Sequence, residues 1–434
     1  MRRAFFLAIL TGCGGGGGTD PDHAGPADVR EFFPVFAYVT AGGWEDHLIG
    51  ARAFGIPGEQ YPDFVCADLA AHGFNAVWLN NIDYALLPRW LDAAGRHGLK
   101  VIAQGMPISA YWDGSGWPWP AGWETIVDDE VKPFYRREVP RFRGDPRLLA
   151  YVIQEENPPQ PAIFTKMREV MDLCAAGDPT HPAIAEYNDV DSVRMAVERT
   201  RPEALVFGVG PFPSPYPGDD EARYFFPWIT EQSHQIGRAG GVPLWMILQG
   251  GDFDVYYDGT FVRRAAERPT RAQLRWQVWF SLLYGAKGIG YFLYTWQHPI
   301  EAAGWHEDLH GLRTRTGQTT EIYEECASIH RSIAPIRSLL LRLDAETRLD
   351  DQDYHWTIRG PGVRSRTFVY RDTRERYLML VNYDFVLAHP AIAPAGLSSA
   401  RFEDVRTGRR FSAGDPGSPV LQAGDGTLLR ILSP

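Results

Sequence analysis

Positions 148–156 read LLAYVIQEE, a run whose pattern repeats along much of the chain. Its first six residues are apolar, and its last three, Gln154, Glu155 and Glu156, are polar. An unbroken apolar run of this length is typical of a strand buried on both faces of a parallel sheet. We therefore expect a strand over Leu148–Gln154 that is covered by helices and presents polar residues at one edge of its sheet.

Similar runs alternate with amphipathic stretches that are typical of helices, such as Phe64–His72 and Pro88–His97, each followed by a helix-stopping glycine. Eight strand–helix units over about 300 residues predict a closed (β/α)8 barrel, with domain bounds 31–343. An open doubly wound sheet is disfavoured because no GxGxxG motif follows a strand. The predicted strands are Phe33–Val39, Ala76–Asn80, Lys100–Gln104, Leu148–Gln154, Ala183–Tyr187, Ala204–Val209, Leu244–Gln249 and Gly288–Tyr294.

The pattern changes after Asp344, which predicts a second domain over 344–434. Short alternating stretches separated by turn residues are typical of a small antiparallel β-sandwich. This domain has no obvious aromatic platform, so we expect it to pack against the barrel rather than bind sugar. Its predicted strands are Tyr354–Ile358, Arg366–Tyr370, Tyr377–Asn382, Ala400–Val405 and Thr427–Leu432.

Barrels of this kind carry their chemistry at the carboxyl ends of the strands, so the predicted strand ends are candidate site residues. Amides, carboxylates and aromatic rings dominate there, which favours a neutral carbohydrate over a phosphate or another anion. Metal-ligand spacing is absent, so we expect neither a metal nor a cofactor, and a net charge of −11 disfavours nucleic acid. The candidate substrate-binding residues are Tyr38, Asn80, Gln104, Gln154, Glu156, Tyr187, Asn188, Gln249 and Tyr294.

Tryptophan is concentrated in the loop after the third predicted strand, where Trp112, Trp117, Trp119 and Trp123 alternate with Gly and Pro. Such a loop either folds onto itself or lines a ligand site. We expect at least one of these rings, with Trp112 as the main candidate, to face the ligand. Trp296, after the eighth strand, is expected to border the same cleft.

The stretch YVIQEENP at 151–158 resembles the fourth-strand segment of clan-A-type glycoside hydrolase barrels. In that family an Asn-Glu or Asp-Glu pair ends the strand, often just before Pro, and the Glu is the general acid/base. The resemblance implies that Glu155 is the acid/base and that Gln154 occupies the preceding amide position. Arg275–Tyr294 is similar to the seventh helix and eighth strand of glycosidase-like barrels, and the resemblance covers about 33–342.

Glu155 and Glu156 are adjacent, so on a strand only one of them would enter the barrel mouth. Register with Tyr151 favours Glu155. The sequence departs from the family at the seventh strand, which ends in Gln249 where retaining enzymes carry a nucleophilic Glu. An amide cannot act as that nucleophile.

Three interpretations stay open. Asp252 could supply the nucleophile, Glu186 or Asp189 could act as the base of an inverting mechanism, or the site could bind sugar without cleaving it. Carboxyl groups about 5–5.5 Å apart imply retention, and about 6.5–9.5 Å implies inversion. The predicted function is hydrolysis of a neutral oligo- or polysaccharide with Glu155 as acid/base. The alternative is a carbohydrate-binding surface lipoprotein on an inactive barrel.

The N-terminal residues indicate a lipid anchor. Two arginines precede an apolar run too short to span a bilayer, and Leu10–Cys13 resembles the lipobox of bacterial lipoproteins. The resemblance implies a signal peptide over 1–12, acylation of Cys13, and a membrane-anchored place in the bacterial cell envelope. Positions 13–30, which contain five consecutive glycines, are expected to form a flexible tether.

Replacement of the anchor residue tests this prediction. Cys13→Ser is expected to move the protein from the membrane fraction to the soluble fraction, because the acylated thiol is lost. Fractionation followed by immunoblotting measures the distribution. Complete retention of the variant in membranes, or a mature protein that still begins at Met1, would contradict the lipoprotein prediction.

Overall fold

The computed structural model describes positions 28–105, 122–156, 159–214, 218–295, 300–302, 305–346, 362–390, 397, 399–413, 415 and 418–433. The lipobox with Cys13 and the predicted ligand-facing residues Trp112, Trp117, Trp119 and Trp296 lie outside the described residues. Within the described part of the chain, no helix is long and apolar enough to cross a membrane.

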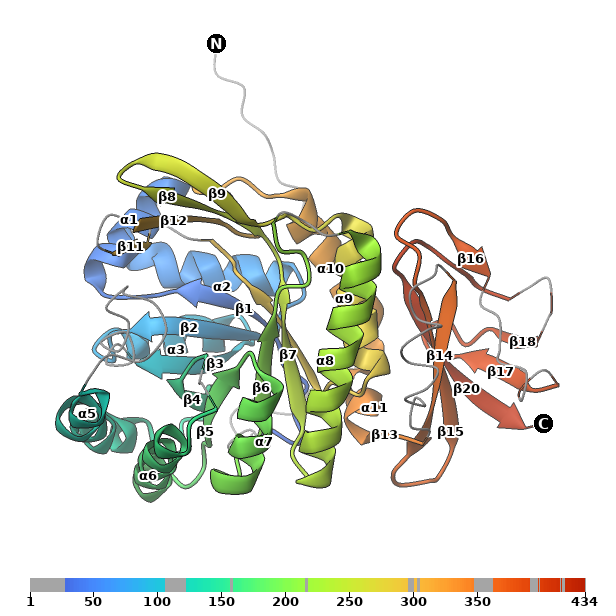
Figure 1. Ribbon diagram of the computed structural model, residues 1–434, viewed down its shortest axis with the longest axis horizontal. Helices are drawn as coiled ribbons and strands as arrows, with labels where there is room; N and C mark the ends of the chain where they lie inside the picture. The colour runs from blue at the N-terminus through green and yellow to red at the C-terminus, as the bar shows by residue number, and fades with distance from the viewer. Residues whose placement is uncertain are drawn as a thin grey trace, which may run out of the picture.

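Eight parallel strands close into a barrel, which confirms the predicted fold (Figure 1). They follow one another round the barrel in chain order, and β4, β5 and β7 have the predicted bounds. β1 begins at Val35 rather than Phe33, and β10 ends at Phe292 rather than Tyr294. The barrel strands are β1 (Val35–Thr40), β2 (Ala76–Ile82), β3 (Lys100–Gly105), β4 (Leu148–Gln154), β5 (Ala183–Tyr187), β6 (Leu205–Val209), β7 (Leu244–Gln249) and β10 (Gly288–Phe292).

Helices cover the outside of the barrel, and several begin at clear capping residues. Asp189 caps α7, because its side chain accepts hydrogen bonds from the backbone N–H groups of Asp191 and Ser192. Thr270 and Gln273 cap α9 reciprocally. The helices are α1 (Trp44–Phe54), α2 (Tyr61–Ala71), α3 (Leu87–Arg96), α4 (Trp123–Ile126), α5 (Lys132–Glu138), α6 (Pro161–Gly177), α7 (Val190–Arg199), α8 (Asp219–Ala239), α9 (Arg271–Leu283), α10 (Glu321–Ile333) and α11 (Arg337–Arg342).

Aromatic rings fill the barrel below its mouth. Phe36 of β1 stacks on Trp78 of β2 with ring centroids 5.6 Å apart, and Trp245 of β7 lies 6.4 Å from Phe36. Gly290 of β10 makes the space, because a Cβ at this position would overlap the Phe36 ring. The interior is therefore a packed core, and the room for a ligand lies above it, at the carboxyl ends of the strands.

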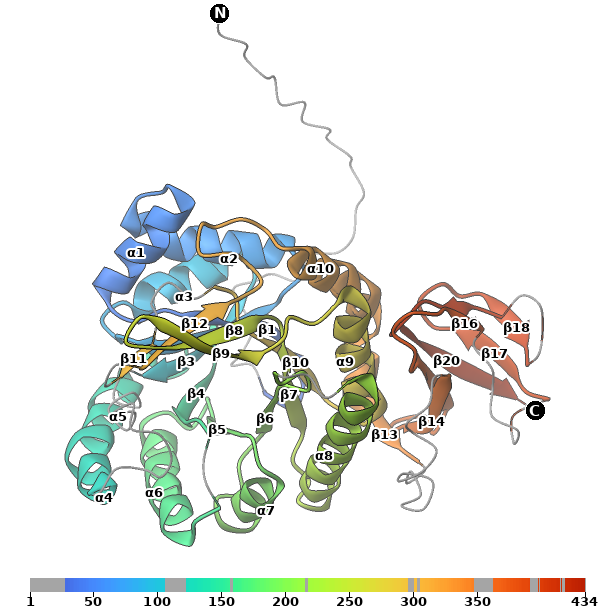
Figure 2. The same ribbon diagram turned by 45° about the horizontal axis from the view of Figure 1, so that its top comes forward.

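Two long loops at the mouth pair with each other. The hairpin of β8 (Asp252–Tyr257) and β9 (Thr260–Ala266) follows β7, while β11 (Ile300–Ala302) and β12 (Trp305–His310) follow β10. Because β8 pairs with β12, the four strands form one sheet, which lies across the end of the barrel (Figure 2). Phe253 packs with the apolar residues of the barrel interior. The strand–helix pattern does not predict this sheet.

The C-terminal region consists of antiparallel sheets, as the predicted β-sandwich requires. Arg366 of this region pairs with Glu231 of α8 at 3.0 Å, and the Tyr383 hydroxyl donates to the Arg223 carbonyl oxygen at 2.6 Å. The predicted strand Tyr354–Ile358 lies outside the described residues. The strands are β13 (Leu343–Ala345), β14 (Val363–Tyr370), β15 (Arg376–Asn382), β16 (His389–Pro390), β17 (Arg401–Asp404), β18 (Arg410–Ser412), β19 (Val420–Leu421) and β20 (Gly426–Ser433).

Overpacking tests the account of the barrel core. Gly290→Ala is expected to lower the free energy of unfolding by about 1–3 kcal/mol, because the added methyl group displaces the Phe36 ring. Gly43→Ala is the comparison variant: its added Cβ would meet no atom closer than 3.8 Å, so it should lose only the N-cap preference for glycine over alanine. Urea unfolding of both variants measures the difference, and equal stabilities would contradict the account.

Candidate active site

A residue at or near the carboxyl end of each barrel strand contributes to a ring at the mouth. Side chains alternate along a strand, so these residues stand two positions beyond the apolar residues of the interior. Most of them are polar and buried. The ring consists of Tyr38, Asn80, Gln104, Gln154, Glu186, Gly208, Gln249 and Phe292.

Glu155 reaches this ring from the end of β4. The Tyr38 hydroxyl donates to its carboxylate, with distances of 2.8 Å and 3.0 Å to the two oxygens. Burial raises the pKa of Glu155 to about 7, although hydrogen bonds from Tyr38, Gln104 and Asn80 act in the opposite direction. A carboxyl group with this pKa is divided between its acid and its carboxylate form near neutral pH.

The register with Tyr151 does not explain the inward position of Glu155. Tyr151 packs among the helices, and its hydroxyl donates to Asp178 at 2.9 Å. Glu155 points to the mouth because the register of β4 against β5 shifts between Val152 and Gln154, which interrupts the alternation of side chains before the end of the strand. The Gln154 amide donates to the Glu155 carbonyl oxygen at 3.1 Å, which holds this turn in place.

Glu186, at the end of β5, is a second buried carboxyl group in the ring. Its Oε2 atom accepts a hydrogen bond from the Glu156 backbone N–H at 3.1 Å. The carboxyl group lies over Gly208 of β6, where any Cβ would overlap it. Burial, together with the charges of Glu156 and Glu155, raises the pKa of Glu186 well above its usual value. The Glu156 side chain itself is exposed, and its backbone is left-handed with φ at 48°.

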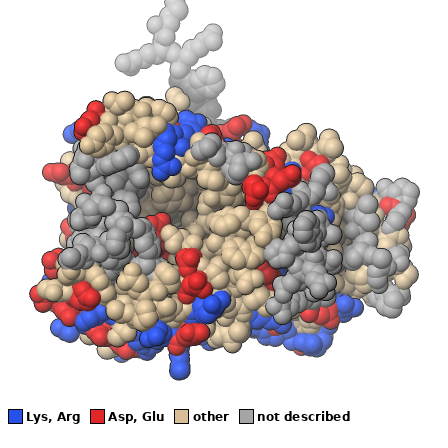
Figure 3. All heavy atoms as spheres, viewed as in Figure 1, with Lys and Arg blue, Asp and Glu red and all other residues tan. Residues whose placement is uncertain are grey.

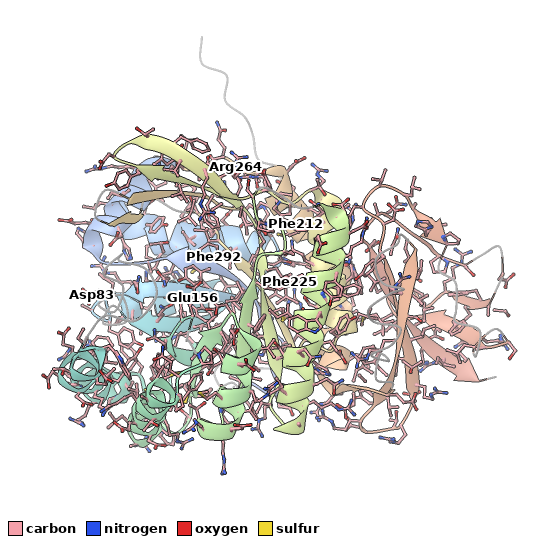
Figure 4. All side chains as sticks on the ribbon, viewed as in Figure 1. Asp83, Glu156, Phe212, Phe225, Arg264 and Phe292 are labelled. Atoms are coloured by element: carbon pink, nitrogen blue, oxygen red, sulfur yellow. The ribbon has the colours of Figure 1, made fainter. Side chains whose placement is uncertain are left out.

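A hollow in the surface marks the mouth. Figure 3 shows this hollow on the face where the four-stranded sheet overhangs the barrel. In the same view, Figure 4 places Phe292 and Glu156 in this region, with Arg264 of β9 above them. Phe292 meets the Tyr38 ring edge-on with centroids 5.1 Å apart. Sequence reasoning missed Phe292 because the eighth strand was expected to continue to Tyr294.

Gln249, at the end of β7, joins three loops. Its Oε1 atom accepts from the Phe212 N–H at 3.1 Å, and its Nε2 atom donates to the carbonyl oxygens of Glu267 at 2.6 Å and Gly251 at 3.2 Å. Gln277 of α9 bonds its backbone N–H at 3.0 Å. These contacts give the side chain a structural role beneath the overhanging sheet.

Asp252 and Asp189, the other candidates for a second carboxylate, are held by local partners. Arg268 and His310 contact the Asp252 carboxylate at 2.6 Å and 3.2 Å. Burial alone would raise the pKa of Asp252, but the hydrogen bonds from His310 and Arg268 bring this pKa below its usual value. Asp252 is thus an anion that stabilises the overhanging sheet, and Asp189 is the cap of α7.

Two predicted substrate-binding residues, both tyrosines, lie away from the ring. The Tyr187 ring is fully buried and stacks on Phe164 of α6. Tyr294 is equally buried, and its hydroxyl donates to Asp68 of α2 at 2.8 Å. Asn188 is exposed beyond the end of β5. The positions of the two tyrosines support a packing role. Among the described residues, no group of three or more His, Cys, Asp or Glu could hold a metal ion.

Comparisons with solved structures agree with this architecture. An Anoxybacillus α-amylase has a TM-score of 0.54 at 12% identity, over 93% of this chain and 98% of that one. AmyP in complex with maltose has a TM-score of 0.51 at 14% identity, over 94% and 97% of the two chains. A β-galactosidase from Marinomonas ef1 has a TM-score of 0.51 at 11% identity, over 72% and 62%.

These likenesses define the class of fold: the chain has the (β/α)8 barrel of glycoside hydrolases. No protein-family model matches the sequence, and no curated protein sequence matches it either.

Restoring a carboxylate at strand seven tests the structural role of Gln249. Gln249→Glu is expected to cost about 1–3 kcal/mol of unfolding free energy, because a carboxylate oxygen would face the Glu267 and Gly251 carbonyl oxygens. Gln318→Glu, the same change at an exposed position, should leave stability within about 0.5 kcal/mol of the wild type. Thermal unfolding compares them. A Gln249→Glu variant as stable as the wild type would contradict this role.

Proposed function

We propose that this protein is a glycoside hydrolase acting on a neutral oligo- or polysaccharide, with Glu155 as its proton donor. The observation that carries the proposal is the position of the Glu155 carboxyl group, which is partly buried at the barrel mouth, is bonded by Tyr38 and has a pKa of about 7. A glycosidic oxygen is a poor leaving group, so its departure needs a carboxylic acid that is still protonated near neutral pH.

Glu186 is the proposed partner of Glu155. The two groups come from neighbouring strands, and each carboxylate disfavours the ionisation of the other, so loss of a proton from one favours its retention on the other. When the pair has lost one of its two protons, it provides an acid and a base together. In this role Glu186 activates the attacking water while Glu155 protonates the leaving oxygen.

The engagement of Asp252 and Asp189 supports this choice. Asp252 is paired with Arg268 and bonded to His310, and a carboxylate that gives up those contacts to attack a sugar would leave the Arg268 guanidinium without its partner. Asp189 would leave the N-terminus of α7 uncapped.

Carbohydrate binding without cleavage is the second candidate function. The structural role of Gln249 favours the binding function. In the resembling family this strand end carries the nucleophile, whereas here the Gln249 side chain bonds the backbone of two loops. A screen of the wild-type protein against aryl glycosides and polysaccharides separates the two. Glycan binding with no cleavage of any substrate would favour the binding function.

Cys13 belongs to the same proposal. Acylation at this residue would tether the barrel to a bacterial membrane through the glycine-rich stretch that follows it, and the hydrolase would then act on glycans at the cell envelope.

Substitution of the two carboxyl groups tests the catalytic assignment. Glu155→Gln is expected to lower turnover of a natural glycan by about 10²–10⁴-fold while binding is retained. An aryl glycoside with an activated leaving group should lose much less, because its departure needs no proton. Glu186→Gln should lose activity on both substrates. Steady-state kinetics measure the rates, and Glu198→Gln on exposed α7 is the control.

The pH dependence follows from the same assignment. The acid must carry its proton, so kcat/KM on a natural glycan should fall as the pH rises through the Glu155 pKa of about 7. Full activity of Glu155→Gln on the natural substrate would remove the assignment.

A further inference from the structure

A chain of hydrogen bonds crosses three strands and ends at Glu155. The Trp78 indole N–H and the Asn80 Nδ2 group both donate to the Gln104 Oε1 atom, each at 3.0 Å. Asn80 Nδ2 also donates to the Tyr38 hydroxyl oxygen, and the Tyr38 O–H donates to Glu155. Trp78, Asn80 and Gln104 are almost fully buried, so water does not compete for these bonds.

The direction of each bond is determined by its neighbour. Gln104 Oε1 accepts from two donors, which orients the amide so that its Nε2 group can donate to Glu155. The Tyr38 oxygen accepts from Asn80, which leaves its single proton for Glu155. Each hydrogen bond in this series therefore helps to stabilise the ionised form of Glu155.

Packing keeps the Tyr38 ring in one orientation. The ring stacks on Trp78 with centroids 5.9 Å apart and an interplanar angle of 22°, and Phe292 closes its edge at 5.1 Å. Its backbone is held as well, because the Tyr294 N–H donates to the Tyr38 carbonyl oxygen at 2.8 Å. Only 6% of Tyr38 is exposed, so the hydroxyl has little freedom to turn to another partner.

We propose that Tyr38 is a positioning residue rather than a sugar-binding one: its hydroxyl, oriented by Asn80 and Gln104, receives the Glu155 carboxylate when that group gives up its proton. The effect on turnover rests on the proposed function, whereas the effect on the protonation of Glu155 does not. The Trp78 indole N–H is the donor farthest from Glu155, and it helps to orient the Gln104 amide.

The charges that face Glu155 act against these donors. Glu156 adjoins it on the turn after β4, Glu186 faces it from β5, and Tyr38 from β1 is neutral, since burial and the three carboxylates raise the pKa of Tyr38 well above its usual value. Burial, Glu156 and Glu186 favour the protonated acid, whereas the donors favour the carboxylate. Removal of a donor must therefore raise the pKa of Glu155.

A carboxyl titration measures this directly. Carbon-13 NMR of glutamate side chains gives the Glu155 pKa, and the resonance is assigned by its loss in Glu155→Gln. Tyr38→Phe is expected to raise this pKa by about one unit, because a donor to the charged form is lost. Tyr84→Phe removes an equally buried hydroxyl that makes only a 3.4 Å contact to the Ala103 carbonyl oxygen, and it should leave the titration unchanged.

A second replacement reverses the sign and preserves the shape of the side chain. Incorporation of 3,5-difluorotyrosine at position 38 makes the hydroxyl a stronger donor, so the Glu155 pKa should fall below its wild-type value. This replacement keeps the test decisive if Tyr38→Phe does not fold. An unchanged titration in the fluorinated protein, or a lower pKa in Tyr38→Phe, would overturn the proposal.

The kinetic readout is separate. In an active enzyme, the falling limb of the kcat/KM profile should move to higher pH in Tyr38→Phe and to lower pH in the fluorinated protein. A merely structural tyrosine would lower the rate without moving the limb, and that result would also count against the proposal. If the wild-type protein cleaves no glycan, the proposed function fails while the titration still tests the role of Tyr38.

Discussion

Desolvation of two carboxyl groups at one rim of the barrel is the constraint around which the site is built. Closure of the sheet brings the ends of β4 and β5 side by side, and the rings of Phe36, Trp78 and Trp245 exclude water from below. A buried carboxylate is costly unless donors or a proton compensate it. Around Glu155 the compensation comes from side-chain donors, and around Glu186 from backbone N–H groups. The pKa of each group is still raised, because these donors do not fully compensate the cost of burying its charge.

Some strand ends carry the buried carboxyl groups, whereas others hold the loops of the mouth in place. In the resembling family the two carboxylates stand on strands four and seven, across the mouth. Here strand seven ends in Gln249, whose amide connects the loop after β6 to the base of the overhanging sheet. An amide suits this task better than a carboxylate, since it both donates and accepts. The overhanging sheet in turn depends on Asp252, so two of the polar residues nearest to strand seven serve the architecture of the mouth.

Much of the fold could be predicted because the barrel repeats a local pattern. Strands β4, β5 and β7 are apolar runs with sharp polar ends, and their bounds follow from the sequence alone. The polar ring follows from alternation, which places Asn80 and Gln104 beside Tyr38. The overhanging sheet as a whole could not be predicted, because β8 pairs with β12 at positions 48 to 58 residues apart, and no local pattern encodes that pairing. The side chains of these loops are brought together by strand pairing, which the periodicity of apolar residues does not predict.

The residues that sequence reasoning misplaced all lie where a strand stops. Tyr187 follows Glu186 by one position, so alternation turns it toward α6, and polarity alone had suggested otherwise. Tyr294 lies beyond the end of β10, where the chain turns and the hydroxyl finds Asp68 instead of the mouth. Glu155 shows the opposite result: unbroken alternation would place it in the helical layer with Tyr151, yet the register shift between Val152 and Gln154 turns it toward Tyr38. At the end of a strand, alternation no longer determines which way a side chain points. Neighbours on other strands position these side chains instead, and the chemistry of a barrel is concentrated among them.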